Sequence, residues 1–152
     1  NRLPGDSEFQ YLGVRIEEFH RLFERIRSPY LGLALDVAHC ELLPGGTPPF
    51  VRAFRDRIHS AQLSDNRGRV DEHMTIGEGT IDFRRVLAAL RRIRFAGPLI
   101  IELFDVAKKL VSHRRLLALM TENGGRRPAG RRTPPPRGRT GSGRPRPRGH
   151  TR

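Results

Sequence analysis

The sequence contains a single cysteine, Cys40, among its 152 residues. One cysteine excludes an internal disulfide and fits a reducing compartment, so we expect a cytoplasmic protein. No apolar run approaches the length of about 18 residues that a membrane-spanning helix needs, so we expect no membrane association. The opening residues also lack the charged and then apolar pattern of a signal peptide. Because the chain starts at Asn1 rather than methionine, we expect it to begin inside a longer protein.

Hydrophobic residues are almost absent from residues 121–152, where Arg, Pro, Gly, Thr and Ser dominate. Such a segment cannot bury enough apolar surface to offset its ordering entropy, so we predict a disordered tail. The tail has ten arginines and one glutamate and thus carries +9 of the total charge of +13. Two interpretations stay open for it: a solvated segment without a function, or a segment that binds nucleic acid through charge.

Residues 1–120 are long enough for one domain with a core of its own. Apolar residues three and four positions apart predict amphipathic helices at 15–27, 82–93 and 105–120, with a shorter helix at 50–57. Short apolar runs predict buried strands at 31–36, 58–63 and 99–103, and loops at 37–49 and 64–81. Asp82 is expected to cap the helix that follows it. The apolar face of the last helix is predicted to consist of Val106, Leu110, Leu117 and Met120.

The alternation of helices and strands predicts an α/β fold with a parallel sheet and right-handed crossovers. Three strands cannot close a barrel, and a parallel sheet is normally covered on both faces. We therefore expect a partial (β/α) TIM-type barrel of about three parallel strands with flanking helices. Its other half would be missing or supplied by another chain, and its unpaired edges predict oligomerisation.

Polar side chains follow all three predicted strands. The residues at these strand ends are Asp36, His39, Gln62, Asp65, Asn66, Asp71, His73 and Glu102. Active sites of α/β folds are built at the carboxyl ends of the strands. The sequence therefore predicts one functional site that all three strand ends share.

Five short motifs occur in register along this part of the chain. They are Asp36-Val-Ala-His39, Gln62-Leu-Ser-Asp65-Asn66, Asp71-Glu-His73, Ile76-Gly77-Glu-Gly79 and Pro98-Leu-Ile-Ile-Glu102. Together they resemble the xylose isomerase-like TIM barrel superfamily, which includes sugar-phosphate isomerases and epimerases and the endonuclease IV type of apurinic/apyrimidinic endonuclease. The resemblance covers roughly residues 1–105 and corresponds to the C-terminal half of that barrel.

This resemblance implies a divalent metal ion, which could be Mn, Mg, Zn or Co. The implied ligands are Asp36, His39, Gln62 and Glu102, with Asp71 and His73 as possible ligands of a second site. Glu102 and His39 are the implied catalytic residues. Gln62 stands where the family usually has a histidine, and its neutral amide oxygen suits Mn²⁺ or Mg²⁺ better than Zn²⁺. The first metal-binding glutamate of the family is expected upstream of Asn1.

Each candidate residue also has a purely structural interpretation. Asp36 could cap a helix, His39 could be a half-buried hydrogen-bonding histidine, and Asp71 and His73 could belong to a solvated loop. Glu102 is the hardest to interpret in this way, because an acid directly after an apolar strand is costly to bury without a partner.

Three functions follow as hypotheses. The first is a metal-dependent isomerase or epimerase acting on a sugar or sugar phosphate, with proton transfer next to a carbonyl. The second is an endonuclease IV-like nuclease for abasic sites, which the Asp71 and His73 pair favours. The third is an inactive barrel fragment whose tail binds polyanions, which predicts binding that falls steeply with salt.

Overall fold

The computed structural model describes residues 13–124. Its elements are α1 (Ile16–Arg25), β1 (Leu33–Asp36), α2 (Val37–Glu41), α3 (Thr47–Ala53), β2 (Ile58–Leu63), α4 (Phe83–Arg92), β3 (Leu99–Ile101) and α5 (Val106–Gly124). The α/β class and the partial TIM-type barrel of three parallel strands with flanking helices are confirmed. Of the expected tail, residues 125–152 lie outside the described part of the chain, and residues 121–124 continue α5.

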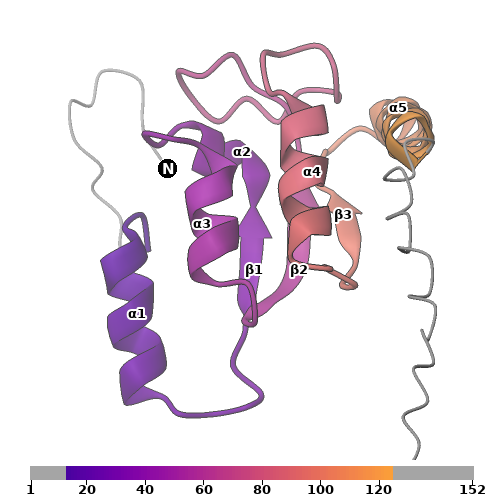
Figure 1. Cartoon of the computed structure of the whole chain (residues 1–152). Coiled ribbons are helices and arrows are strands. Elements are labelled where there is room, and N and C mark those ends of the chain that lie inside the picture. Colours follow the sequence, from indigo (N-terminus) through magenta and orange to yellow (C-terminus); the bar gives the residue numbers. More distant parts are fainter. Residues whose placement is uncertain (1–12, 125–152) are drawn as a thin grey trace, which may run out of the picture.

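The three strands form one sheet in the order β1-β2-β3 (Figure 1). Parallel pairing aligns Asp36 with Gln62 and Gln62 with Ile100. Paired residues of neighbouring strands point to the same side of a sheet, and residues two apart do so as well. Asp36, Gln62 and Ile100 therefore share one face of the sheet.

Helices α3 and α4 stand side by side against the opposite face of the sheet (Figure 1). The apolar core between them and the sheet includes Leu33, Leu35, Ala61, Leu63, Phe50, Val51, Phe54, Phe83, Val86, Leu87 and Leu90. Helix α4 begins as predicted, since the Asp82 carboxylate accepts a hydrogen bond from the Arg85 backbone N–H at 3.0 Å. The face that carries Asp36 and Gln62 has no such cover within residues 13–124, and Ala34 and Ile100 on it are exposed.

One predicted segment was wrong, and a second has different bounds. The expected loop at 37–49 contains helix α2, because the Asp36 carboxylate caps this helix by accepting from the His39 N–H at 3.1 Å. The helix expected at 50–57 is α3, which starts earlier, at Thr47. Two prolines occupy its first turn, where a proline ring fits and no backbone N–H is needed.

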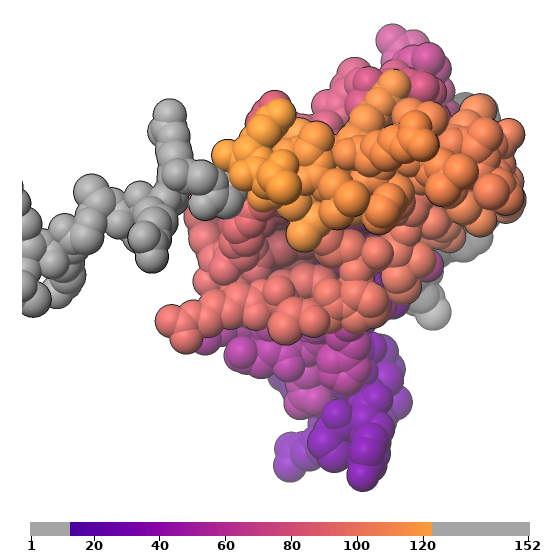
Figure 2. Space-filling view, turned by 90° about the vertical axis from the view of Figure 1, so that its right-hand side faces the viewer, coloured from indigo at the N-terminus to yellow at the C-terminus, as the bar shows by residue number. Residues whose placement is uncertain are grey.

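The predicted apolar face of the last helix was also wrong. Its members Val106, Leu110, Leu117 and Met120 are all exposed, and α5 instead buries Ser112 and Leu116. The Ile76 N–H donates to Ser112 Oγ at 3.1 Å, and Arg115 Nη1 donates to the Ile76 carbonyl at 2.7 Å. These two bonds fix which side of α5 turns inward. The helix is seen nearly end-on in Figure 1, whereas α4 stands upright, and Figure 2 shows α5 across the outer surface.

None of the helices within residues 13–124 is long and apolar enough to span a membrane.

Candidate active site at the carboxyl ends of the strands

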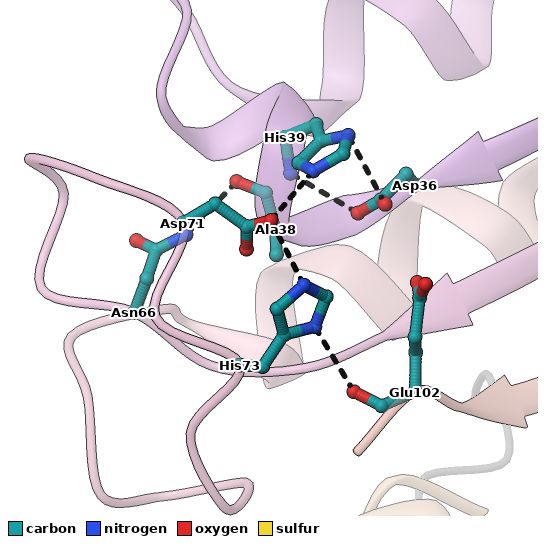
Figure 3. A network of polar contacts seen from close by, with 7 residues as sticks. All are labelled: Asp36, Ala38, His39, Asn66, Asp71, His73 and Glu102. Carbon is teal, nitrogen blue, oxygen red and sulfur yellow. Dashed lines mark hydrogen bonds and ion pairs between the residues drawn. The ribbon is translucent and has the colours of Figure 1, made fainter. Parts of the chain in front are cut away.

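The carboxyl ends of β1, β2 and β3 lie at one edge of the sheet, and polar side chains meet there (Figure 3). A chain of contacts runs from Asp36 through His39, Asp71 and His73 to the backbone of Glu102. Of the sequence-predicted site residues, these five are connected directly. Gln62 lies on the same face of the sheet as Asp36 and is half-buried.

His39 lies between two carboxylates. Its Nδ1 is 3.2 Å from Asp36 Oδ2, and its Nε2 is 2.8 Å from Asp71 Oδ2. The hydrogen bond to Asp71 raises the pKa of His39, and the negative charges of Asp36 and Asp71 add to this effect although burial opposes it. The protonated ring can donate to both carboxylates at once, because each nitrogen then carries a hydrogen.

Asp71 joins the two histidines through a single oxygen atom. Its Oδ2 is 3.0 Å from His73 Nε2 as well as 2.8 Å from His39 Nε2. Burial raises the pKa of the Asp71 carboxyl, but the hydrogen bond from His39 and the charges of both histidines outweigh burial and lower it. The other oxygen, Oδ1, is buried and has no hydrogen-bond partner within residues 13–124.

His73 has an uncommon backbone conformation. Its φ is +47°, in the left-handed region that side chains other than glycine rarely adopt. The Nδ1–H of its ring donates to the Glu102 carbonyl at 3.3 Å. Strained backbone of this kind persists where the surrounding structure enforces it, and it is concentrated at functional sites.

Glu102 follows β3 directly and is anchored by its backbone. Its N–H donates to the Leu63 carbonyl at 3.0 Å, which continues the pairing of β2 with β3 by one residue. Its side chain forms no hydrogen bond with Asp71, which joins the two histidines. The Oε2 atom is buried without a partner in the described part of the chain, which is the costly arrangement that the sequence suggested.

Phe104 is a member of this site that the sequence analysis missed. Its side chain is 90% exposed, and its ring lies edge-on to His73 with 5.4 Å between the ring centroids. A large exposed aromatic ring beside buried polar groups is a common feature of ligand sites. The signal in the sequence was an aromatic residue two positions after the acid that ends a strand.

The other histidines within residues 13–124 lie outside this network. His20, His59 and His113 are exposed, and the His20 ring packs against Phe54. Cys40 is buried in α2, and burial raises the pKa of its thiol to about 12, with the charges of Asp36 and Glu41 adding to the effect. The thiol is therefore protonated at neutral pH and is not a nucleophile of this site.

The sequence of this chain is similar to those of known proteins. The profile of the family described as xylose isomerase-like TIM barrel matches residues 4–122. The uncharacterized protein MJ1311 of Methanocaldococcus jannaschii is 34% identical over 94 residues, 60% of this chain and 32% of that protein. The uncharacterized protein y4fM of Sinorhizobium fredii is 29% identical over 81 residues, 53% of this chain and 26% of that protein. The chain thus spans about a third or less of these relatives' length.

Solved structures share the fold. A D-tagatose 3-epimerase-like protein has a TM-score of 0.72 at 29% identity, over 77% of this chain and 45% of that one. An L-ribulose 3-epimerase has a TM-score of 0.61 at 18% identity, over 81% and 48%. A D-allulose 3-epimerase from Methylomonas sp. has a TM-score of 0.58 at 20% identity, over 73% and 43%. The family match over most of the chain and the shared fold lead to one conclusion: the chain belongs to the xylose isomerase-like TIM barrel family.

Proposed function

We propose that this chain takes part in the divalent-metal-dependent epimerisation or isomerisation of a sugar or sugar phosphate. In such a reaction a proton leaves and returns to a carbon next to a carbonyl. The observation that carries the proposal is the contact network at the strand ends, with the unpartnered Glu102 carboxylate oxygen beside it. The similarity to a D-tagatose 3-epimerase-like protein supports a ketose as the substrate class.

The donor chemistry of the site fits a metal ion. No three acidic, imidazole or thiol side chains within residues 13–124 are grouped closely enough to hold an ion as they stand. However, Asp71 Oδ1 and Glu102 Oε2 are buried oxygens without partners in that part of the chain, and a cation would satisfy them. Asp36, Gln62 and Glu102 would hold it, with His39 as either a further ligand or a donor to the sugar, and Asp71 and His73 would be available for a second ion. A bound divalent ion would polarise the carbonyl of the sugar.

The residues themselves would move the proton and orient the sugar. The Glu102 carboxylate is also the proposed base, because it directly follows β3 and has two oxygens, one of which could take the proton while the other holds the ion. Where His39 does not hold the ion, its ring, with a raised pKa, is the proposed donor to a sugar hydroxyl. Phe104 offers an apolar face at the edge of the site, against which the C–H side of a sugar ring can lie.

Deuterium uptake from D₂O tests this function at the step that defines it. The full chain would be incubated with Mn²⁺ and a panel of ketohexoses and ketopentoses, and mass spectrometry would measure deuterium bound to carbon. We expect uptake with at least one sugar and a loss of about 100-fold in Glu102→Gln. Glu24→Gln, which changes an exposed glutamate on α1, is the matched control. No uptake above a protein-free blank, or equal uptake in Glu102→Gln, would contradict the proposal.

Cleavage of DNA at abasic sites is the second candidate. The Asp71 and His73 pair favours it, because the two side chains are in contact at 3.0 Å within the network. Gln62 disfavours this nuclease function, since an amide oxygen is a weaker zinc ligand than imidazole. Incubation of an abasic duplex with the chain and Zn²⁺, followed by denaturing electrophoresis, distinguishes the two functions.

A further inference from the structure

A fully buried carboxylate follows the central strand β2 of the proposed site. Asp65 follows β2 by two residues, has no exposed surface and forms no ion pair within residues 13–124. Its oxygens are instead satisfied by backbone N–H groups. Oδ1 accepts from Asn66 at 2.9 Å and Ile81 at 3.1 Å, and Oδ2 accepts from Gly77 at 2.8 Å and Gly79 at 3.0 Å. Four backbone donors thus replace the counter-ion that a buried charge needs.

The backbone of Asp65 closes the loop that carries Asp71 and His73. Its N–H donates to the Met74 carbonyl at 2.9 Å, and the Met74 N–H donates back to the Asp65 carbonyl at 2.8 Å. The loop between these two residues therefore starts and ends at the same point. Met74 is the residue immediately after His73, so this pairing fixes the backbone next to the strained histidine.

Asn66 ties the same loop to the helix that carries His39. It is fully buried, and its Nδ2 donates to the Ala38 carbonyl at 2.9 Å, as Figure 3 shows. Its Oδ1 accepts from the Gly68 N–H at 2.8 Å. The loop is thereby held against α2, on the side where Asp71 meets His39.

The fit around Asp65 leaves no room for a side chain at Gly79. A Cβ at that position would lie 2.3 Å from both the Asn66 carbonyl oxygen and Asp65 Oδ1. Neither atom can give way easily, because one belongs to the backbone and the other is held by two N–H donors. The glycine therefore permits the close approach on which the four hydrogen bonds depend.

We propose that Asp65 is a positioning residue, which holds the loop at residues 66–79 so that the His73 ring stays in place between Asp71 and Glu102. The left-handed backbone of His73 costs free energy and persists because this framework enforces it. This inference rests on the proposed function, because that function gives the His73 ring its role in the site. The positioning itself can be measured without metal or sugar, so it can fail independently of that function.

Nuclear magnetic resonance of the full chain tests the proposal through the His73 ring. The ring signals would be assigned as those that vanish in His73→Gln, and the nuclear Overhauser contact between His73 and Phe104 would report their packing. Two variants perturb the framework in different ways. Asp65→Asn removes one acceptor oxygen, and Gly79→Ala keeps the carboxylate but pushes it away. Asp82→Asn is the control, because this acid caps α4 outside the loop.

We expect Asp65→Asn and Gly79→Ala to shift the His73 ring signals and to abolish the contact with Phe104. The signals of His59 and His113 and the circular dichroism should stay unchanged, and Asp82→Asn should leave His73 unaffected. Unchanged His73 signals in either folded variant would overturn the proposal. Loss of the whole fold in both variants would also overturn it, because Asp65 would then support the domain rather than the loop.

Discussion

At the scale of single residues, the contact between His39 and Asp71 joins helix α2 to the loop at residues 66–79. Both partners could be found in the sequence as polar residues after strand ends, but their contact could not. It joins residues 32 positions apart through a 2.8 Å bond that depends on where α2 and the loop meet. Phe104 was missed for the same reason, because an exposed phenylalanine gains meaning only from its contact with His73.

The pair predicts a pH dependence of stability in the metal-free chain. The raised pKa of His39 stabilises the fold below the ordinary value of about 6.5, and this contribution is lost as pH rises through the raised value. The lowered pKa of Asp71 stabilises the fold above about 3.9, and this contribution is lost as pH falls through the lowered value. We therefore expect the pair to contribute fully between about pH 4 and pH 6.5.

Urea unfolding in EDTA at several pH values would measure this effect. The free energy of unfolding should fall from pH 6 to pH 8, and His39→Gln should flatten that fall. His113→Gln, at an exposed position on α5, should keep it. An equal fall in the parent chain and His39→Gln would show that the pair does not contribute.

Phe104→Ala separates binding from folding. Because the side chain is 90% exposed, we expect no measurable change in unfolding. Loss of the aromatic face should weaken sugar binding by about 1 kcal/mol, or roughly fivefold in Kd. Calorimetric titration with the sugar that gives deuterium uptake checks the binding, and unchanged affinity would remove Phe104 from the site.

At the scale of elements, the apolar spacing predicted α1, α4 and all three strands, because each places apolar side chains in the core or against it. It failed for α2, which has only five residues and depends on the Asp36 cap rather than on a long apolar face. It also failed for the orientation of α5. Ser112 and Arg115 on its inward side hydrogen-bond the backbone of Ile76, and hydrophobic spacing does not reveal such polar anchors.

The cap of α4 gives a prediction at this scale. Asp82→Ala removes the carboxylate that accepts from the Arg85 N–H, and we expect a loss of about 1 kcal/mol in the free energy of unfolding. Asp56→Ala is the control, since this side chain is 82% exposed and forms an ion pair with the neighbouring Arg55 at the surface. Chemical denaturation of both variants would measure the difference, and equal stability would show that the cap does not matter.

At the scale of the whole molecule, residues 13–124 contain an open sheet and a helix, α5, with an exposed apolar face. Within residues 13–124 both β1 and β3 pair on one side only. The apolar residues of α5 that were expected inside are 40% to 69% exposed. The sequence predicted the open half-barrel, because three strands cannot close. It could not predict which helix face would stay uncovered, since that depends on what packs against it.

These surfaces predict self-association. An exposed apolar stripe beside a free strand edge favours contact between copies of the chain. We expect the sedimentation coefficient of the parent to rise with concentration, and Leu110→Gln with Leu117→Gln to weaken that rise. Leu22→Gln, at an exposed leucine on α1, is the comparison. A parent chain that stays monomeric at all concentrations would contradict this prediction.

A calorimetric titration of the full chain with Mn²⁺, run beside Glu102→Gln and the exposed control Glu24→Gln, tests the metal site at the strand ends most directly. We expect saturable binding near one equivalent in the parent and the control, and its loss in Glu102→Gln, because the buried Glu102 oxygen has no other partner within residues 13–124. Absence of saturable binding in the parent, or the same binding in Glu102→Gln, would contradict a metal site at the strand ends.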